Sequence, residues 1–191
     1  MNKIRCDWCE KDDLYRDYHD NEWGNPVFDD DTIFEFLVLE SFQAGLSWLT
    51  ILKKRENFRN AFSDFNYHEI ANYSKAEVEE LMSNSGIVRN RLKILATINN
   101  AQRFIEVQQE FGSFSKYIWN FVEGKPIVNY PETLAEVPNT SSISDALASD
   151  LKKRGFKFLG STVMYAHMQA TGMVNDHVKS CWKKTFKIFL N

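Results

Sequence analysis

The sequence is poor in cysteine, proline and glycine, with only 3, 4 and 8 of these among its 191 residues. Three cysteines are too few for a secreted domain held together by disulfides, so we interpret them as free thiols or metal ligands. No apolar run is long enough to cross a bilayer, and the first residues lack the apolar segment of a signal peptide. These absences predict a cytoplasmic protein without a membrane partner.

The sequence also lacks an excess of basic residues, and its formal net charge is −3. This balance argues against a surface that binds polyanions everywhere, so any contact with nucleic acid must be made by a local basic face. A chain of this length can bury one substantial core. We therefore expect residues 1–191 to form a single domain and to act as a monomer.

Almost the whole chain has helical periodicity, and no segment alternates convincingly like a strand. Ser74 and Glu77 have the spacing of a capping box, and Gly112 lies where a long helix should end. Three of the four prolines fall in residues 125–140, which we predict to be a loop. The sequence thus predicts an all-α bundle of about eight to ten elements. The longer helices are expected over residues 29–42, 46–62, 74–82, 89–112, 114–124, 142–155 and 161–172.

Glu40 is the unusual residue of the first long helix. It follows Ile33 and Phe36 on the apolar stripe, although glutamate is almost never fully buried unless it is paired. Either the stripe opens onto a pocket at Glu40, or a cation meets the carboxylate. A glutamate at the helix edge that leans into solvent is the ordinary alternative. Trp48 could border the same space, and a buried carboxylate with aromatic walls would suit a flat cationic group.

Four aromatic residues fall in one short polar segment near the N-terminus, where helical periodicity is weak. They are Trp8, Tyr15, Tyr18 and Trp23. Most aromatic side chains fill a core, but a cluster in a polar segment favours a binding site.

His177 and Cys181 are four residues apart near the C-terminus. If this segment is helical, both side chains lie on one face and supply half of a tetrahedral metal site. The other candidate ligands are Cys6, Cys9 and His19. Spacing alone allows Cys6 with Cys9, or one of these cysteines with His19, and it also allows that no metal binds.

Basic residues gather around the turn "KKRGFKFLGS" between two expected helices, at residues 152–161. The backbone N–H groups at the start of the second helix could bind a phosphate. Cations that merely decorate a helix C-terminus are the common alternative. The basic residues of this turn are Lys152, Lys153, Arg154 and Lys157, and a second patch could comprise Arg89, Arg91 and Lys93.

Taken together, "YHDNEWG" (18–24), "LESFQAGLSWLTILKKRENF" (39–58), "KKRGFKFLGST" (152–162) and "GMVNDHVKSC" (172–181) resemble the 3-methyladenine DNA glycosylase I family. The resemblance extends from about Cys6 to Cys181. Because that family belongs to the helix-hairpin-helix DNA glycosylases, the resemblance implies an all-α fold with a helix-hairpin-helix element that binds alkylated double-stranded DNA. It also implies that the protein flips out and excises 3-methyladenine by hydrolysis of the N-glycosidic bond.

The resemblance implies a structural zinc ion that joins the two ends of the chain. Its implied ligands are Cys6, His19, His177 and Cys181. Four protein ligands would leave no open position for a catalytic water. Cys9 is an extra cysteine that could compete for the metal.

The resemblance also implies a base pocket in which Glu40 is the catalytic residue. The implied base-binding residues are Tyr18, Trp23 and Trp48, with Trp8 and Tyr15 nearby. The residues implied to contact DNA are Lys157, Gly160, Ser161 and Thr162.

Two positions depart from the helix-hairpin-helix pattern. Relatives that also cut the strand carry a lysine where this chain has Thr162, so we predict no lyase activity. The superfamily's catalytic aspartate would fall near Ser180 and Cys181, and Asp176 is the nearest carboxylate. A base that is already cationic leaves as a neutral group and needs no general acid. We therefore expect Glu40 to act in recognition and electrostatics.

Three other functions were compared with this one. A zinc-stabilised DNA-binding module without catalysis would leave Glu40 and the aromatic cluster unexplained. A hydrolase of small nucleosides would not need the basic turn. A redox protein that uses Cys6 and Cys9 would be expected to show a βαβ pattern, which the sequence lacks.

Overall fold

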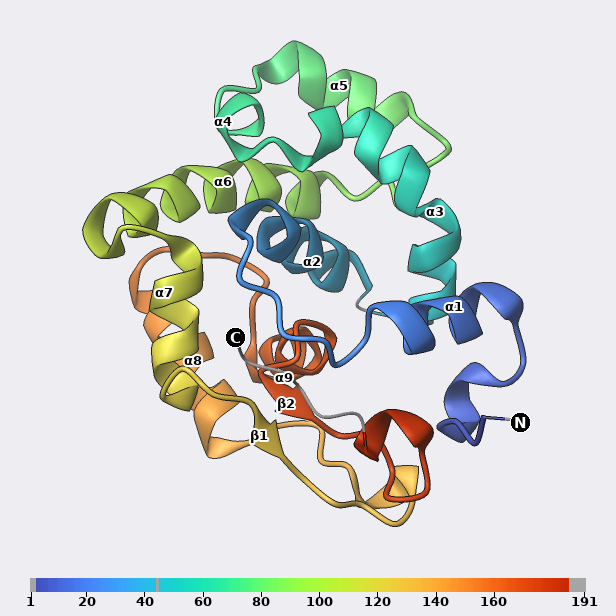
Figure 1. The fold of residues 1–191 in the computed structure, drawn as a ribbon. Helices are drawn as coiled ribbons and strands as arrows, with labels where there is room; N and C mark the ends of the chain where they lie inside the picture. Colours follow the sequence, from blue (N-terminus) through green and yellow to red (C-terminus); the bar gives the residue numbers. More distant parts are fainter. Residues whose placement is uncertain (1–2, 44, 186–191) are drawn as a thin grey trace.

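The computed structural model describes residues 3–43 and 45–185, and most of these residues are helical (Figure 1). The α-helices are α1 (Asp13–Asn21), α2 (Asp30–Gln43), α3 (Trp48–Ala61), α4 (Tyr67–Ile70), α5 (Lys75–Ser83), α6 (Arg91–Phe111), α7 (Phe114–Trp119), α8 (Ser142–Lys153) and α9 (Ser161–Ala170). Short 3-10 helices are η1 (Asp7–Cys9), η2 (Ser63–Phe65), η3 (Asn120–Val122), η4 (Leu134–Glu136) and η5 (Trp182–Thr185). In the described residues, no helix is both long and apolar enough to span a membrane.

Helix α2 lies in the middle of the molecule, between α3, α6 and α9 (Figure 1). Every residue from Ile33 to Phe42 is buried, so a single apolar stripe is too narrow a description of this helix. Burial on all sides requires its charged side chains to find partners or a cavity. Glu35 finds partners on α3, because its carboxylate accepts hydrogen bonds from Arg55 (2.7 Å) and Arg59 (3.1 Å).

The helix ends follow local sequence signals. Ser74 and Glu77 form the predicted capping box of α5, and Gly112 ends α6 in the left-handed conformation (φ 84°). Ser47 caps α3, so this helix begins at Trp48, two residues later than expected. Leu46 therefore lies outside the helix and is 40% exposed.

The described residues are mostly helical, as predicted, and two short parallel strands accompany the helices. β1 (Ile127–Val128) pairs with β2 (Val174–Asn175), with Ile127 opposite Val174 and Val128 opposite Asn175. Strands of two residues are too short to show a period-two pattern, so they could not be predicted from the sequence. Their pairing fastens the proline-rich segment to the C-terminal part of the chain.

Helices α8 and α9 pack against each other and are joined by a turn at residues 154–160. Two side chains of α6 hold this turn in place. The side chain of Asn100 accepts a hydrogen bond from the backbone N–H of Lys157 (2.8 Å) and donates one to its carbonyl (2.9 Å). Asn99 donates to the carbonyl of Gly155 (2.9 Å). The conformation of the turn is thus set by side chains 56 and 57 residues earlier in the sequence.

Candidate functional site

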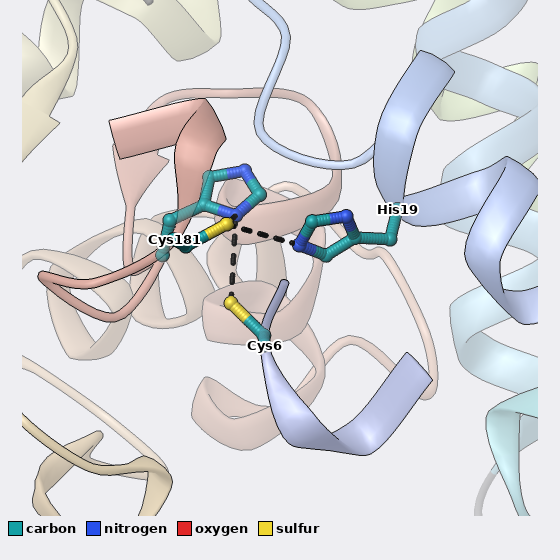
Figure 2. Close-up of side chains that lie close together, drawn as sticks. Cys6, His19 and Cys181 are labelled. Atoms are coloured by element: carbon teal, nitrogen blue, oxygen red, sulfur yellow. Dashed lines mark hydrogen bonds between the residues drawn. The ribbon is translucent and has the colours of Figure 1, made fainter. Parts of the chain in front are cut away.

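Four buried side chains from the two ends of the chain converge at one point. Cys6 precedes η1, His19 lies on α1, and His177 and Cys181 follow β2. One ligand atom from each of the four lies within 4.8 Å of those from the others. Figure 2 shows Cys6, His19 and Cys181 pointing toward one another from three separate segments.

The distances inside this cluster fit a tetrahedral metal ion. The sulfur of Cys181 lies 3.4 Å from Nε2 of His19 and 3.6 Å from Nδ1 of His177. The sulfur of Cys6 lies 3.6 Å from the same Nδ1. Metal–sulfur bonds of about 2.3 Å and metal–nitrogen bonds of about 2.0 Å, set at tetrahedral angles, separate sulfur from nitrogen by about 3.5 Å. The four residues could therefore hold a metal ion.

Both histidines are oriented by hydrogen bonds at their second ring nitrogen. Nδ1 of His19 lies 2.9 Å from the carboxylate of Asp20, and Nε2 of His177 lies 3.3 Å from the carbonyl oxygen of Trp23. Each acceptor fixes a proton on that nitrogen and leaves the other nitrogen free to bind a metal. Gly24 permits this close approach, because a Cβ there would lie 2.9 Å from Nε2 of His177.

The two thiols differ in acidity because they share this space. Hydrogen bonding to Cys6 and to the two imidazoles lowers the pKa of the Cys181 thiol. The hydrogen bond between Cys6 and Cys181, together with burial, raises the pKa of the Cys6 thiol. Two neighbouring thiolates repel each other unless a cation lies between them, as a metal-binding site would provide.

The conformation around His177 differs from the expected helix. β2 is followed by a turn in which the backbone N–H of Cys181 donates to the carbonyl of Val178 (2.9 Å), so this turn brings the two ligands together. Among the described residues Cys9 lies outside the cluster. Its thiol donates instead to the carbonyl oxygen of Cys6 (3.1 Å). The structure thus brings Cys6 and His19, and not Cys9, together with His177 and Cys181.

A cavity of about 660 Å³ lies beside the cluster. All the predicted pocket residues line it, and they come from both ends of the aromatic segment and from α2 and α3. They are Trp8, Tyr15, Tyr18, Trp23, Glu40 and Trp48. The aromatic segment is more helical than its sequence indicated, since Tyr15 and Tyr18 lie on α1.

The aromatic rings form a continuous wall that reaches His19 of the Cys/His cluster. The centroid of the Trp8 ring lies 4.8 Å from that of Tyr15, 5.1 Å from that of Trp23 and 5.4 Å from that of His19. The ring of Tyr18 lies 5.6 Å from that of Trp48. Burial raises the pKa of Tyr15 and, more strongly, that of Tyr18. Both phenols are therefore neutral at physiological pH.

Glu40 points into this cavity and not into solvent. Its side chain is buried, at 4% exposure, and burial raises its pKa to about 8. Within residues 3–43 and 45–185, no hydrogen bond or ion pair reaches its carboxylate. An unpaired carboxylate in an aromatic cavity is costly for the free protein, and such costs are typical of ligand-binding sites.

The residues predicted to contact DNA lie at the end of the turn and in the first residues of α9. Lys157 and Gly160 are exposed, and Gly160 is the N-cap residue of α9. The hydroxyl of Ser161 bonds to Asp145, whereas Thr162 is exposed and also lines the cavity. The turn and the cavity therefore share one surface.

The basic patches are smaller than the sequence indicated. The guanidinium group of Arg154 is paired with Glu110 (2.7 Å) and Asp150 (2.8 Å). Lys93 is buried and donates to the carbonyl oxygen of Phe42 (3.0 Å). Lys152, Lys153 and Lys157 remain exposed around the turn.

Several cavity residues had not been expected from the sequence. One group comes from the proline-rich loop, which β1 carries to the cavity, and comprises Leu134, Val137, Pro138 and Asn139. A second group lies on α9 and comprises Val163, Tyr165, Ala166 and Gln169. A third follows Glu40 and comprises Gln43, Gly45 and Leu46. The spacing of Thr162, Tyr165 and Gln169 on one helix face was the available signal for the second group.

The chain is similar to known proteins along most of its length. The sequence profile of the methyladenine glycosylase family matches residues 8–184. DNA-3-methyladenine glycosylase 1 of Escherichia coli (strain K12) is 49% identical over 177 residues, which cover 93% of this chain and 95% of the relative. DNA-3-methyladenine glycosylase of Haemophilus influenzae is 46% identical over 181 residues, which cover 95% of this chain and 98% of the relative.

Solved structures are similar to the same extent. A crystal structure of a 3-methyladenine DNA glycosylase I matches with a TM-score of 0.91 at 49% identity, covering 94% of this chain and 98% of that one. A structure that describes 3-methyladenine recognition by the Staphylococcus aureus enzyme matches with a TM-score of 0.91 at 39% identity, covering 94% of this chain and 96% of that one.

Proposed function

Because this chain belongs to the methyladenine glycosylase family, we propose that it is a DNA-3-methyladenine glycosylase. It flips a 3-methyladenine nucleotide out of alkylated double-stranded DNA and hydrolyses the N-glycosidic bond, leaving an abasic site. The observation that carries this proposal is the carboxylate of Glu40, which is buried in an aromatic cavity and has no partner among residues 3–43 and 45–185. We further propose that residues 1–191 act as one domain, as a monomer and in the cytoplasm.

Recognition of the base follows from the walls of the cavity. Adenine methylated at N3 carries a positive charge while it is attached to its sugar. The faces of Tyr18 and Trp48 favour such a cation over neutral adenine by roughly 1–2 kcal/mol when water is excluded. Glu40 can accept a hydrogen bond from the exocyclic amine, and a charge-assisted bond of this kind is about twice as strong as a neutral one. The cavity thus distinguishes damaged from undamaged adenine by the positive charge of the damaged base.

The raised pKa of Glu40 couples binding to ionisation. With a pKa of about 8, the free carboxyl group is largely protonated at neutral pH. A cationic base beside it favours the carboxylate and so lowers its pKa. The ionised carboxylate then stabilises the positive charge that moves toward the sugar as the bond breaks. Since the departing base is neutral, no general acid is required.

Contact with DNA is proposed at the α8–turn–α9 element, as a helix-hairpin-helix. The first turn of α9 has no side-chain cap among the described residues, so its N–H groups can bind a phosphate. Gly160 has an ordinary φ of −72°, and a Cβ there would meet nothing within 4 Å. The fold itself does not require glycine, which supports a close approach by the DNA backbone. Thr162 cannot form a Schiff base, so no strand cleavage is expected.

Zinc is the proposed occupant of the four-residue cluster. Cys6, His19, His177 and Cys181 are the donor set of a structural zinc site, and the sulfur–nitrogen distances of 3.4–3.6 Å fit that ion. Zinc would supply a fixed charge between the two thiolates and take no part in the reaction. Its role is to hold the aromatic wall, because the ring of His19 packs against that of Trp8.

The activity is tested by incubating the purified protein with methylated duplex DNA and identifying the released bases by chromatography. We expect release of 3-methyladenine, retention of 7-methylguanine and an uncut strand. No released base from a folded sample that binds duplex DNA would overturn the proposal in favour of a non-catalytic binding module.

Glu40→Gln in single-turnover assays then tests the role of the carboxylate. If it abolishes excision while binding of free 3-methyladenine is unchanged, Glu40 acts in the chemistry and not in recognition.

A further inference from the structure

One face of α9 forms a wall of the cavity. The aromatic segment that lines the rest of the cavity comes from the other end of the chain. Thr162, Tyr165, Ala166 and Gln169 line the cavity, at the spacing of one helix face. Tyr165 is buried and Gln169 is half-buried. Neither residue has a role in the recognition described above, although both bring polar atoms to the base pocket.

Both side chains are bound to Asp176, which lies between β2 and the metal ligand His177. The carboxylate of Asp176 is 2% exposed and accepts three hydrogen bonds. The hydroxyl of Tyr165 and Nε2 of Gln169 each donate to Oδ2 at 2.8 Å. Nδ2 of Asn129 donates to Oδ1 at 2.7 Å. Asp176 is therefore a buried acceptor at the back of the α9 wall.

This arrangement fixes which atoms face the ligand. A carboxylate accepts hydrogen bonds and donates none, so the amide of Gln169 must turn its NH2 group toward Asp176. Its oxygen Oε1 is then directed away from Asp176, and in the described part of the chain that oxygen has no hydrogen-bond partner. The proton of Tyr165 is likewise committed to Asp176. The α9 wall thus offers hydrogen-bond acceptors to the cavity.

We propose that Gln169 is a specificity-determining residue that accepts a hydrogen bond from an N–H donor of the flipped base, and that Asp176 is its positioning residue. The proposal rests on the glycosylase function proposed above. Adenine carries an amine at position 6, whereas guanine carries a carbonyl oxygen there. Acceptors supplied by Gln169 and Glu40 match the amine, and they would face the lone pairs of the guanine oxygen. The α9 wall therefore favours 3-methyladenine over 3-methylguanine.

The test compares Gln169→Leu with the wild-type protein on duplex DNA that contains both 3-methyladenine and 3-methylguanine. Loss of a hydrogen bond of ordinary strength should lower excision of 3-methyladenine about tenfold. Excision of 3-methylguanine should change much less, so the ratio of the two released bases should fall about tenfold. Because one sample releases both bases, the ratio does not depend on the fraction of folded protein. Gln102→Leu is the matched control, because Gln102 is exposed on α6 and lies outside the cavity lining.

Asp176→Asn tests the positioning role with the same ratio. An asparagine at this position can donate as well as accept, so it no longer fixes the amide of Gln169. The ratio should fall in the same direction, and Asp176→Asn combined with Gln169→Leu should lower it no further than Gln169→Leu alone. A purely structural role for Asp176 would lower both excision rates together and leave the ratio unchanged.

The outcomes separate this inference from the function on which it rests. If the wild-type protein releases no 3-methyladenine, the glycosylase function itself is wrong. If the wild-type protein is active and the ratio in Gln169→Leu equals that in Gln102→Leu, the glycosylase function stands and the role of Gln169 is overturned.

Discussion

Replacing Glu40 by glutamine should stabilise the protein, by an amount that grows with pH. The pKa of Glu40 is about 8 in the folded protein and about 4.3 in an unfolded chain. Each tenfold difference between these acid constants corresponds to about 1.4 kcal/mol. The folded state holds the proton more tightly, so the stabilising effect of protonated Glu40 is fully present below about pH 4 and is lost as the pH rises to about 8.

The size of this effect follows from the same values. Relative to a side chain that stays neutral, ionisable Glu40 should cost on the order of 2 kcal/mol at about pH 6 and 5 kcal/mol near pH 9. Glutamine has nearly the shape of protonated glutamate and cannot ionise. Glu40→Gln should therefore match the wild-type stability at about pH 4 and exceed it by several kcal/mol in mild alkali.

The assay is urea unfolding of both proteins across this pH range, with identical zinc content confirmed at each pH. The difference between the two unfolding free energies isolates Glu40, because the other ionisable groups are shared. A gain of about 3 kcal/mol in a chain of this size corresponds to a rise in Tm of roughly 6–12 °C. A difference that stays constant with pH, or a variant that is less stable in alkali, would refute the assignment of Glu40 as a buried and unpaired carboxyl group.

Three further perturbations address the Cys/His cluster and the α8–α9 turn. Cys181→Ser should lower Tm by at least about 6 °C, because it removes a proposed metal ligand. Calorimetry gives Tm and elemental analysis gives the zinc content; a variant without zinc whose Tm is unchanged would show that the cluster does not stabilise the fold through a metal. Gly160→Ala should weaken binding to duplex DNA roughly tenfold without lowering Tm, and equal affinity in a fluorescence titration would exclude close contact at this residue. Asn100→Ala leaves two backbone groups of Lys157 unpaired and should cost about 1–3 kcal/mol; it should weaken DNA binding while binding of free 3-methyladenine, followed by tryptophan fluorescence, stays unchanged.

Features governed by neighbouring residues could be predicted from the sequence. The capping box at Ser74 and the end of α6 at Gly112 depend on residues within one helical turn. The apolar position of Glu40 on its own helix could be identified in the same way, but the sequence left exposure to solvent open as an alternative, and the fold shows that Glu40 is buried. The surrounding aromatic wall required the resemblance to a family, because Tyr18 and Trp48 meet only after α1 and α3 have packed together.

Features governed by distant pairs could not be predicted in this way. Two residues in each of β1 and β2 carry the proline-rich loop to the cavity, and neither strand has a periodicity of its own. Asp176 could be seen as a carboxylate near a metal ligand, but its donors lie 47, 11 and 7 residues away. The orientation of Gln169 depends on that network. Sequence spacing placed Gln169 on a helix face, and only the fold placed Asp176 behind it.

The Cys/His cluster and the aromatic cavity depend on each other because both are built from the same short segments. His19 contributes a ligand atom on one side and packs its ring against Trp8 on the other. Trp23 lines the cavity while its carbonyl oxygen orients His177. Asp176, next to His177, orients the α9 wall. A change in the position of His19 or His177 therefore moves a wall of the cavity as well as the cluster.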